Sequence, residues 1–246
     1  MKIEKIIKLK SGKYKIFLDN NEQITTFDDV ILNNNLLFHK EIDNDIYVKI
    51  KEENNYYELL NSSIKYISKR LRSEKEIKIY LEKKTTDIYL IDSIIDNLKS
   101  QKLIDDRNFS RAYINDKLNL TNTGILKIKK DLHNLGVDPE IIEEECSRID
   151  IKKDNNKLEK MIIRKIKTNH KYSNKMLKEK ILNDMTNLGY DYESIINIYD
   201  KFEHNDEDIY NREYQKIYNK LKNKYQGREL ELNIKKKLYS KGFINK

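Results

Sequence analysis

The stretch GILKIKKDLHNLGVDPEII, residues 124–142, contains the end of one helix and the start of the next. Its apolar residues recur at intervals of three and four, which places them on one face of an α-helix: Ile125, Ile128, Leu132 and Leu135. Gly136 follows the last of them, where a helix C-cap needs a positive φ that glycine adopts easily. Asp138 as N-cap and Pro139 in the first turn then predict a second helix.

This pattern recurs along the chain at a regular interval. The glycines stand 53 residues apart, at Gly136, Gly189 and Gly242. An isoleucine precedes each glycine by eight residues, at Ile128, Ile181 and Ile234. Aspartates at the helix start recur as well, at Asp87, Asp138 and Asp191. Equal spacing of several residue types indicates a repeated structural unit.

A further helix is predicted ahead of each pair, over residues 57–72, 107–119, 154–169 and 208–225. The fold class is therefore mainly α, with tandem three-helix repeats stacked into an elongated curved array. Ahead of them, segments 2–10, 13–19 and 22–27 predict short strands and 27–38 a helix, giving a small β-containing N-terminal domain. The expected organisation is this domain, three repeats and a truncated fourth, with limits 1–55, 56–105, 106–152, 153–205 and 206–246.

Composition supports helices over a β-sandwich, because the chain has one proline and six glycines. Hydrophobic residues are 38% and charged residues 37% of the chain, which favours small stacked units over one thick core. The single cysteine, Cys146, excludes an intrachain disulfide and is expected to be structural. The N-terminal segment lacks the apolar region of a signal peptide and no run is long enough to span a membrane, so a cytoplasmic location is expected.

Charge is distributed in blocks along the C-terminal half. Residues 152–180 contain eleven Lys/Arg and three Asp/Glu, a net charge of +8. Residues 181–211 have a net charge of −7, and residues 212–246 again have +8. Basic blocks of this kind can bind nucleic acid or the acidic face of a protein, or simply form a solvated lysine-rich surface.

The adjacent aspartates Asp105 and Asp106 suggest either helix capping or a catalytic or metal-binding pair. Capping is favoured, because they stand directly before a helix and no His, Cys or Asp spacing completes a metal site. The four histidines, His39, His133, His170 and His204, are scattered and are expected at surface or packing positions. No phosphate-binding loop or nucleophile–base arrangement is present in the sequence, so neither an enzyme nor a cofactor is predicted.

Three stretches together resemble the RecX family of regulatory proteins. They contain an Arg-x-x-Ser motif at 70–73, an apolar-Asp-Asp-x-x-Phe junction within 103–109 and a glycine-bounded helix at 124–136. The resemblance covers residues 62–150 closely and 151–203 mainly through the repeat spacing. Residues 1–55 loosely resemble the extra N-terminal domain of longer members, and 206–246 extend beyond the usual three repeats.

The resemblance implies a protein without enzymatic activity that binds the RecA filament on single-stranded DNA. It implies inhibition or modulation of ATP hydrolysis and strand exchange in recombination and DNA repair, and contact with single-stranded and also double-stranded DNA. The candidate contact residues are cations on the repeat helices: Arg70, Arg72, Arg107, Arg111, Lys129, Lys130, Arg164, Lys165, Lys167 and Lys171. The residues assigned to capping or structure are Asp87, Asp105, Asp106, Gly136, Asp138, Gly189, Asp191 and Gly242. The alternatives are a general DNA-binding helical repeat and a helical scaffold for another protein.

Overall fold

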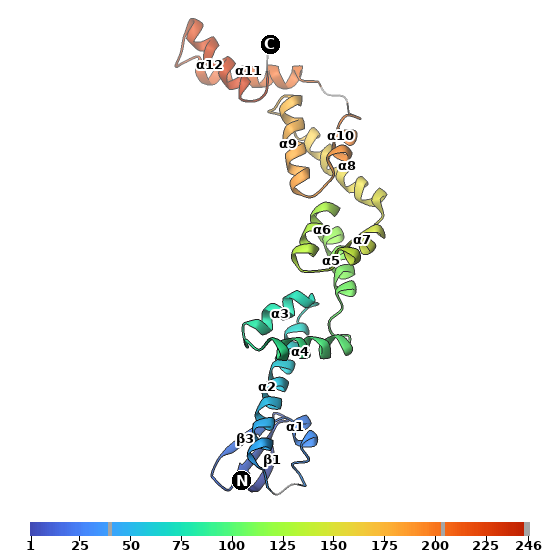
Figure 1. The fold of residues 1–246 in the computed structure, drawn as a ribbon. Helices are drawn as coiled ribbons and strands as arrows, with labels where there is room; N and C mark the ends of the chain where they lie inside the picture. The colour runs from blue at the N-terminus through green and yellow to red at the C-terminus, as the bar shows by residue number, and fades with distance from the viewer. Residues whose placement is uncertain (39–40, 203–204, 244–246) are drawn as a thin grey trace. The chain divides into compact units, whose positions relative to one another are not determined.

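A computed structural model describes residues 1–38, 41–202 and 205–243. These residues form two compact units, one of residues 1–109 with 135–137 and one of residues 110–134 with 138–246. The described residues contain twelve α-helices and one three-stranded sheet (Figure 1). The predicted fold class, three-helix units after a small β-containing domain, is confirmed.

The chain begins with an antiparallel sheet in the order β1-β2-β3, formed by Ile3–Lys8, Tyr14–Leu18 and Gln23–Thr26. Alternate residues of β2 and β3 are buried, among them Ile16, Leu18 and Ile24, so one face of the sheet packs on the core. The helix expected over 27–38 is shorter, because α1 (Asp28–Asn33) ends at a turn in which Asn35 has a φ of 50°. The three predicted strands are confirmed.

Helix α2 (Asn44–Ile67) belongs to two hydrophobic cores. Its N-cap Asp43 accepts a hydrogen bond from the backbone N–H of Ile46 at 2.7 Å. Ile50 is buried in the core beneath the sheet, whereas Leu59 and Leu60 are buried in the core of the first repeat. The domain limit expected at 55/56 thus lies inside one continuous helix.

The first repeat adds α3 (Glu74–Glu82) and α4 (Ile88–Ser100) to the end of α2. Ser73 and Glu76 form a capping box at the start of α3, and the Asp87 carboxylate accepts from the N–H of Leu90 at 3.1 Å at the start of α4. The apolar faces of these helices meet in one cluster around Ile77, Leu81 and Ile94.

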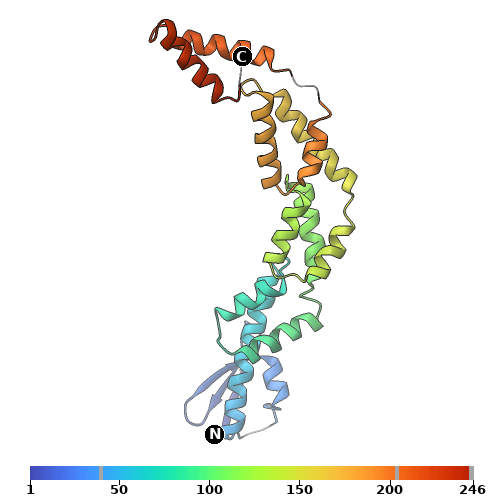
Figure 2. The same cartoon turned by 45° about the horizontal axis from the view of Figure 1, so that its top comes forward.

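The second unit contains the remaining repeat helices apart from the first residues of α5, 106–109, and these helices are drawn in green to red in Figure 1. Their bounds are α5 (Asp106–Leu120), α6 (Ile125–Asn134), α7 (Pro139–Ser147), α8 (Ile151–Lys167), α9 (Asn174–Asn187), α10 (Tyr192–Tyr199), α11 (Glu207–Leu221) and α12 (Gly227–Tyr239). Helices α8, α9 and α10 share a core that includes Leu158, Ile181 and Ile195. Helices α11 and α12 lie side by side in both views (Figures 1 and 2) and bury Ile217 and Ile234 between them.

The repeat glycines lie where two chain segments approach closely. Gly189 has a φ of 90°, and a Cβ placed on it would collide with the backbone and Cβ of Lys127 at the start of α6. The same junction is fixed by backbone hydrogen bonds from Gly124 N–H to Leu188 O at 2.7 Å and from Leu126 N–H to Gly189 O at 3.0 Å. Within the first unit, Gly136 has a φ of 83° and lies against the side chain of Lys75 in α3. The glycines that recur at equal spacing therefore lie at contacts between helix pairs as well as at helix ends.

Candidate functional site

In the first repeat, Arg70 and Arg72 both bind the carboxylate of Glu76. The Arg70 guanidinium lies 2.5 and 3.1 Å from the two Glu76 oxygens. The Arg72 side chain is only 12% exposed, donates to Glu76 at 3.2 Å and lies 3.9 Å over the ring of Tyr66. Burial raises the pKa of Glu76, but hydrogen bonds from Arg70, the Ser73 backbone and Arg72 outweigh it and hold this pKa below its usual value. Arg72 thus has an internal role, whereas Arg70 retains a half-exposed side chain.

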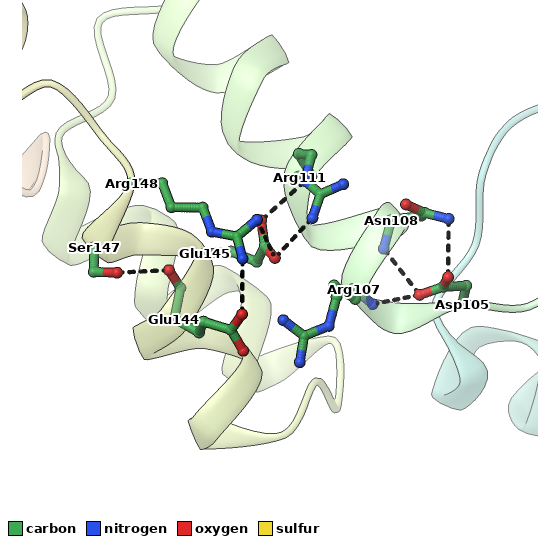
Figure 3. Close-up of polar contacts among 8 residues, drawn as sticks. All are labelled: Asp105, Arg107, Asn108, Arg111, Glu144, Glu145, Ser147 and Arg148. Atoms are coloured by element: carbon green, nitrogen blue, oxygen red, sulfur yellow. Dashed lines mark hydrogen bonds and ion pairs between the residues drawn. The ribbon is translucent and has the colours of Figure 1, made fainter.

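In the second repeat, Arg111 projects from α5 toward Glu145 of α7 (Figure 3). Its Nε and Nη2 atoms each lie 3.0 Å from a different Glu145 oxygen, a bidentate geometry. Arg148 adds an Nη1 contact of 3.3 Å to Glu145 and donates to Glu144 at 2.8 Å. The Glu145 side chain is 1% exposed, so these arginines neutralise a buried carboxylate while parts of both guanidinium groups face solvent.

Two lysines among the candidates also bind carboxylates of a neighbouring helix. Lys129 Nζ lies 2.6 and 2.8 Å from the oxygens of Glu143, and Lys165 Nζ lies 2.5 Å from Asp184. Both contacts are at least partly exposed, and such ion pairs contribute little to stability. They can be exchanged for contacts with an external anion at low cost.

The other candidate cations are exposed or half-buried. Lys130 lies on α6, and Arg164 and Lys167 lie on the last turn of α8, where cations complement the helix dipole. Among the described residues no ion pair is found for these three side chains. Arg107 lies on the first turn of α5, where its backbone N–H donates to Asp105 at 2.9 Å.

The loop from α8 to α9 places an aromatic side chain next to two lysines. Lys171 Nζ and Lys180 Nζ lie 5.1 and 4.6 Å from the centre of the Tyr172 ring. Asn169 fixes the loop by accepting from the N–H of Tyr172 at 3.0 Å and donating to its carbonyl at 2.7 Å. We name the exposed cations of this region the α8–α9 cation patch, made of Arg164, Lys167, Lys171 and Lys180.

Asp105 and Asp106 have different partners. The Asp105 carboxylate accepts from the N–H groups of Arg107 and Asn108 at 2.9 and 3.0 Å and so caps its own helix (Figure 3). The Asp106 carboxylate accepts from the N–H of Glu74 at 2.8 Å, at the start of α3. Both carboxylates therefore bind backbone N–H groups at helix starts.

Several residues of these sites had no distinct sequence signal. Glu145 follows the buried Ile142 by three residues on α7, and this place on an apolar face is what distinguishes it from its acidic neighbours. Arg148, Tyr172 and Lys180 gain their roles only through contacts across the chain. Asp154 is 8% exposed, and its Oδ1 atom has no hydrogen-bond partner among the described residues.

The described part of the chain contains no group of three or more His, Cys, Asp or Glu side chains arranged to hold a metal ion. Cys146 is buried, and burial raises the pKa of its thiol. His39 and His204 lie outside the described residues. No described helix has an apolar stretch of the length that a bilayer crossing needs.

The three-helix units, with ion-paired and exposed cations on their helices, define a helical-repeat protein. The model of the second three-helix domain of RecX matches residues 105–144. The chain is 32% identical to the regulatory protein RecX of Streptococcus agalactiae serotype III (strain NEM316), over 99% of this chain and 95% of the relative. It is 29% identical to the regulatory protein RecX of Streptococcus sanguinis (strain SK36), with the same coverage.

Solved structures show the same fold. A crystal structure of a regulatory protein RecX aligns with a TM-score of 0.70 at 21% identity, covering 81% of this chain and 98% of the other. The RecX crystal structure from Lactobacillus salivarius aligns with a TM-score of 0.56 at 23% identity, covering 61% and 97%. The chain belongs to the RecX family of regulatory proteins.

Proposed function

We propose that this protein binds the RecA recombinase filament on single-stranded DNA and inhibits or modulates its ATP hydrolysis and strand exchange. The observation that carries the proposal is the 32% identity to a regulatory protein RecX over 99% of the chain. In this role the protein acts in the cytoplasm by binding, without chemistry of its own.

The ten candidate cations remain the proposed contacts, and the structure suggests an order among all of them except Arg107, which is left unranked. Lys130, Arg164, Lys167 and Lys171 come first, because they are exposed and no ion pair of theirs is found in the described part of the chain. Arg70, Lys129 and Lys165 come next, since each is itself at least partly exposed but must exchange a carboxylate contact of its own chain for an external one. Arg111 and Arg72 come last, because their guanidinium groups already neutralise Glu145 and Glu76.

The α8–α9 cation patch supports a second candidate function, direct binding of single-stranded DNA. Cations beside an aromatic ring suit a strand whose phosphates bind lysine and whose bases stack. Tyr172 is half-buried next to Lys171 and Lys180, which provides both features in one loop.

An affinity comparison separates these two functions. A fluorescent single strand, bare or coated with RecA, is titrated with the protein at one salt concentration. Recognition of the filament predicts tighter binding to the coated strand. A general DNA binder would prefer the bare strand, and its affinity would fall with salt by a logarithmic slope of about −0.7 per phosphate contact. The triple variant Lys130→Glu, Arg164→Glu, Lys167→Glu should weaken binding, with Lys49→Glu on α2 as control.

A further inference from the structure

The second unit contains a cavity of about 600 Å³ between α5, the end of α7 and the first turns of α8. Its apolar lining consists of Ile114, Leu118 and Ile149, and its amide lining consists of Asn115, Asn119 and Asn156. This volume lies within the range of small-molecule sites, which combine an apolar wall with a few placed polar groups. Of the ten candidate cations, only Arg111 is among the residues that line this cavity.

Contacts at both ends hold the walls of the cavity in place. Lys157 Nζ donates to the carbonyl oxygen of Leu118 at 2.8 Å and also to that of Thr121, so α8 is tied to the end of α5. At the other end, Arg111 of α5 and Arg148 after α7 both bind Glu145. The walls of the cavity are therefore held in place by contacts within the chain.

The hydrogen bonds and ion pairs within the chain leave three amides and one carboxylate oxygen available to a ligand. Lys157 is committed to carbonyl oxygens, and Glu145 is neutralised by two arginines. Asn115, Asn119 and Asn156 are exposed, and each amide offers both donors and an acceptor. Asp154 lines the cavity, is 8% exposed, and has a carboxylate oxygen without a hydrogen-bond partner in the described residues.

The chemistry of these groups defines the ligand. A flat, neutral group with donors and acceptors along its edge would fit between the apolar side chains and bind the asparagines, since Asn recognises base edges through two hydrogen bonds. Its donor would also satisfy the buried carboxylate of Asp154. Lys160 lines the cavity and is exposed, and the half-exposed Arg148 lies nearby, so a phosphate attached to this group would meet cations.

We propose that this cavity is a nucleotide site, which holds one unstacked nucleobase against Ile114, Leu118 and Ile149 with its phosphate at Lys160 and Arg148. The proposal rests on the proposed function for the origin of the base, since a single strand bound to a recombinase would supply an unstacked base. A free nucleotide has the same chemistry and is the other source.

The test uses 2-aminopurine, whose emission rises when it leaves a base stack. The full-length protein is titrated into an oligothymidine strand with one central 2-aminopurine, and separately into the 2-aminopurine nucleoside monophosphate. We expect the strand's emission to rise to saturation. The double variant Asn115→Ala, Asn119→Ala should need about ten times more protein, because loss of one two-bond base contact weakens binding by roughly that factor.

Both substitutions lie at exposed helix positions where alanine is favourable, so the variant is expected to fold. Asn183→Ala, an exposed amide on α9, is the matched control and should bind as the unmodified protein does. A saturable rise in the emission anisotropy of the monophosphate, with no response of the strand, would support the site and assign it to free nucleotides. No emission rise of the strand together with no anisotropy change of the monophosphate, or equal binding by the double variant, would overturn the proposal.

ATP hydrolysis by RecA, measured with the same proteins, separates this proposal from the proposed function. Inhibition by the unmodified protein without any change in 2-aminopurine emission would overturn only the nucleotide site. Absence of inhibition together with a saturable emission change would contradict the proposed function and leave the site supported.

Discussion

The carboxylate of Asp106 accepts a hydrogen bond from the backbone N–H of Glu74, 2.8 Å away. Asp206 makes the same contact with the N–H of Asn174 at 2.7 Å. In both cases the preceding residue caps the following helix, since Asp105 accepts from Arg107 N–H and Asn205 from Glu207 N–H. Two adjacent side chains thus satisfy orphan N–H groups of two different helices.

The first prediction concerns Asp106. Asp106→Ala should lower the free energy of unfolding by about 1 kcal/mol, because the first turn of α3 loses its external acceptor. Urea unfolding followed by circular dichroism measures the change. Asp116→Ala, an exposed position on the same α5, serves as control. Equal stability of the two variants would mean that the Glu74 contact is not formed in solution.

A second prediction concerns the repeat glycine at 189. Gly189→Ala should destabilise the second unit by roughly 1–3 kcal/mol, since the new Cβ meets Lys127 and alanine is strained at a φ of 90°. Gly12→Ala is the matched control, because Gly12 has a φ of 85° but nothing within 4 Å of a built Cβ. Thermal unfolding of both variants separates the close contact from the backbone strain. A Gly189→Ala loss no larger than that of Gly12→Ala would contradict the close approach.

A third prediction concerns the buried carboxylate of Glu145. Arg111→Ala should cost about 1–3 kcal/mol, because it removes two hydrogen bonds from a charged group that is 1% exposed. Glu145→Gln removes the charge, so adding it to Arg111→Ala should recover part of this loss. A double-mutant cycle by urea unfolding measures the coupling between the two residues. Additive losses would show that Arg111 does not stabilise Glu145.

A fourth prediction is a pH dependence that Glu76 contributes. Its pKa is lower in the folded than in the unfolded protein, so the folded state binds the proton less tightly. Its contribution to stability is complete above the unfolded pKa and is lost as the pH falls through the folded pKa. Glu76→Gln should therefore lose less stability than the unmodified protein on acidification. Glu82→Gln, exposed on the same helix, is the control, and identical acid profiles for all three proteins would refute the assignment.

The helical part of the fold could be predicted because its signals are local. Apolar spacing, a glycine stop and an aspartate start act within a few residues, and α6 and α7 follow from them directly. The hydrogen bond that Asp87 makes at the start of α4 is of the same local kind. The continuity of α2 through the limit expected at residue 55 was not predictable in this way, because one helix there contributes to two cores.

For the candidate site, the sequence could predict which residue types take part but not which contacts they make. The sequence identifies exposed cations, but whether a given cation binds a carboxylate of its own chain depends on helix packing. Arg111 and Lys130 look alike in sequence, yet Arg111 binds Glu145 from another helix and Lys130 is exposed. The partner of Asp106 is 32 residues away, which local spacing does not reveal.

The most direct test is ATP hydrolysis by RecA on single-stranded DNA, with this protein titrated at constant salt and with DNA in excess. If the protein acts on the filament, hydrolysis will fall at amounts of protein well below those of RecA, and adding more DNA will leave this fall unchanged. The triple variant Lys130→Glu, Arg164→Glu, Lys167→Glu should inhibit less than the Lys49→Glu control. Unchanged hydrolysis, or a fall that added DNA abolishes, would contradict action on the filament.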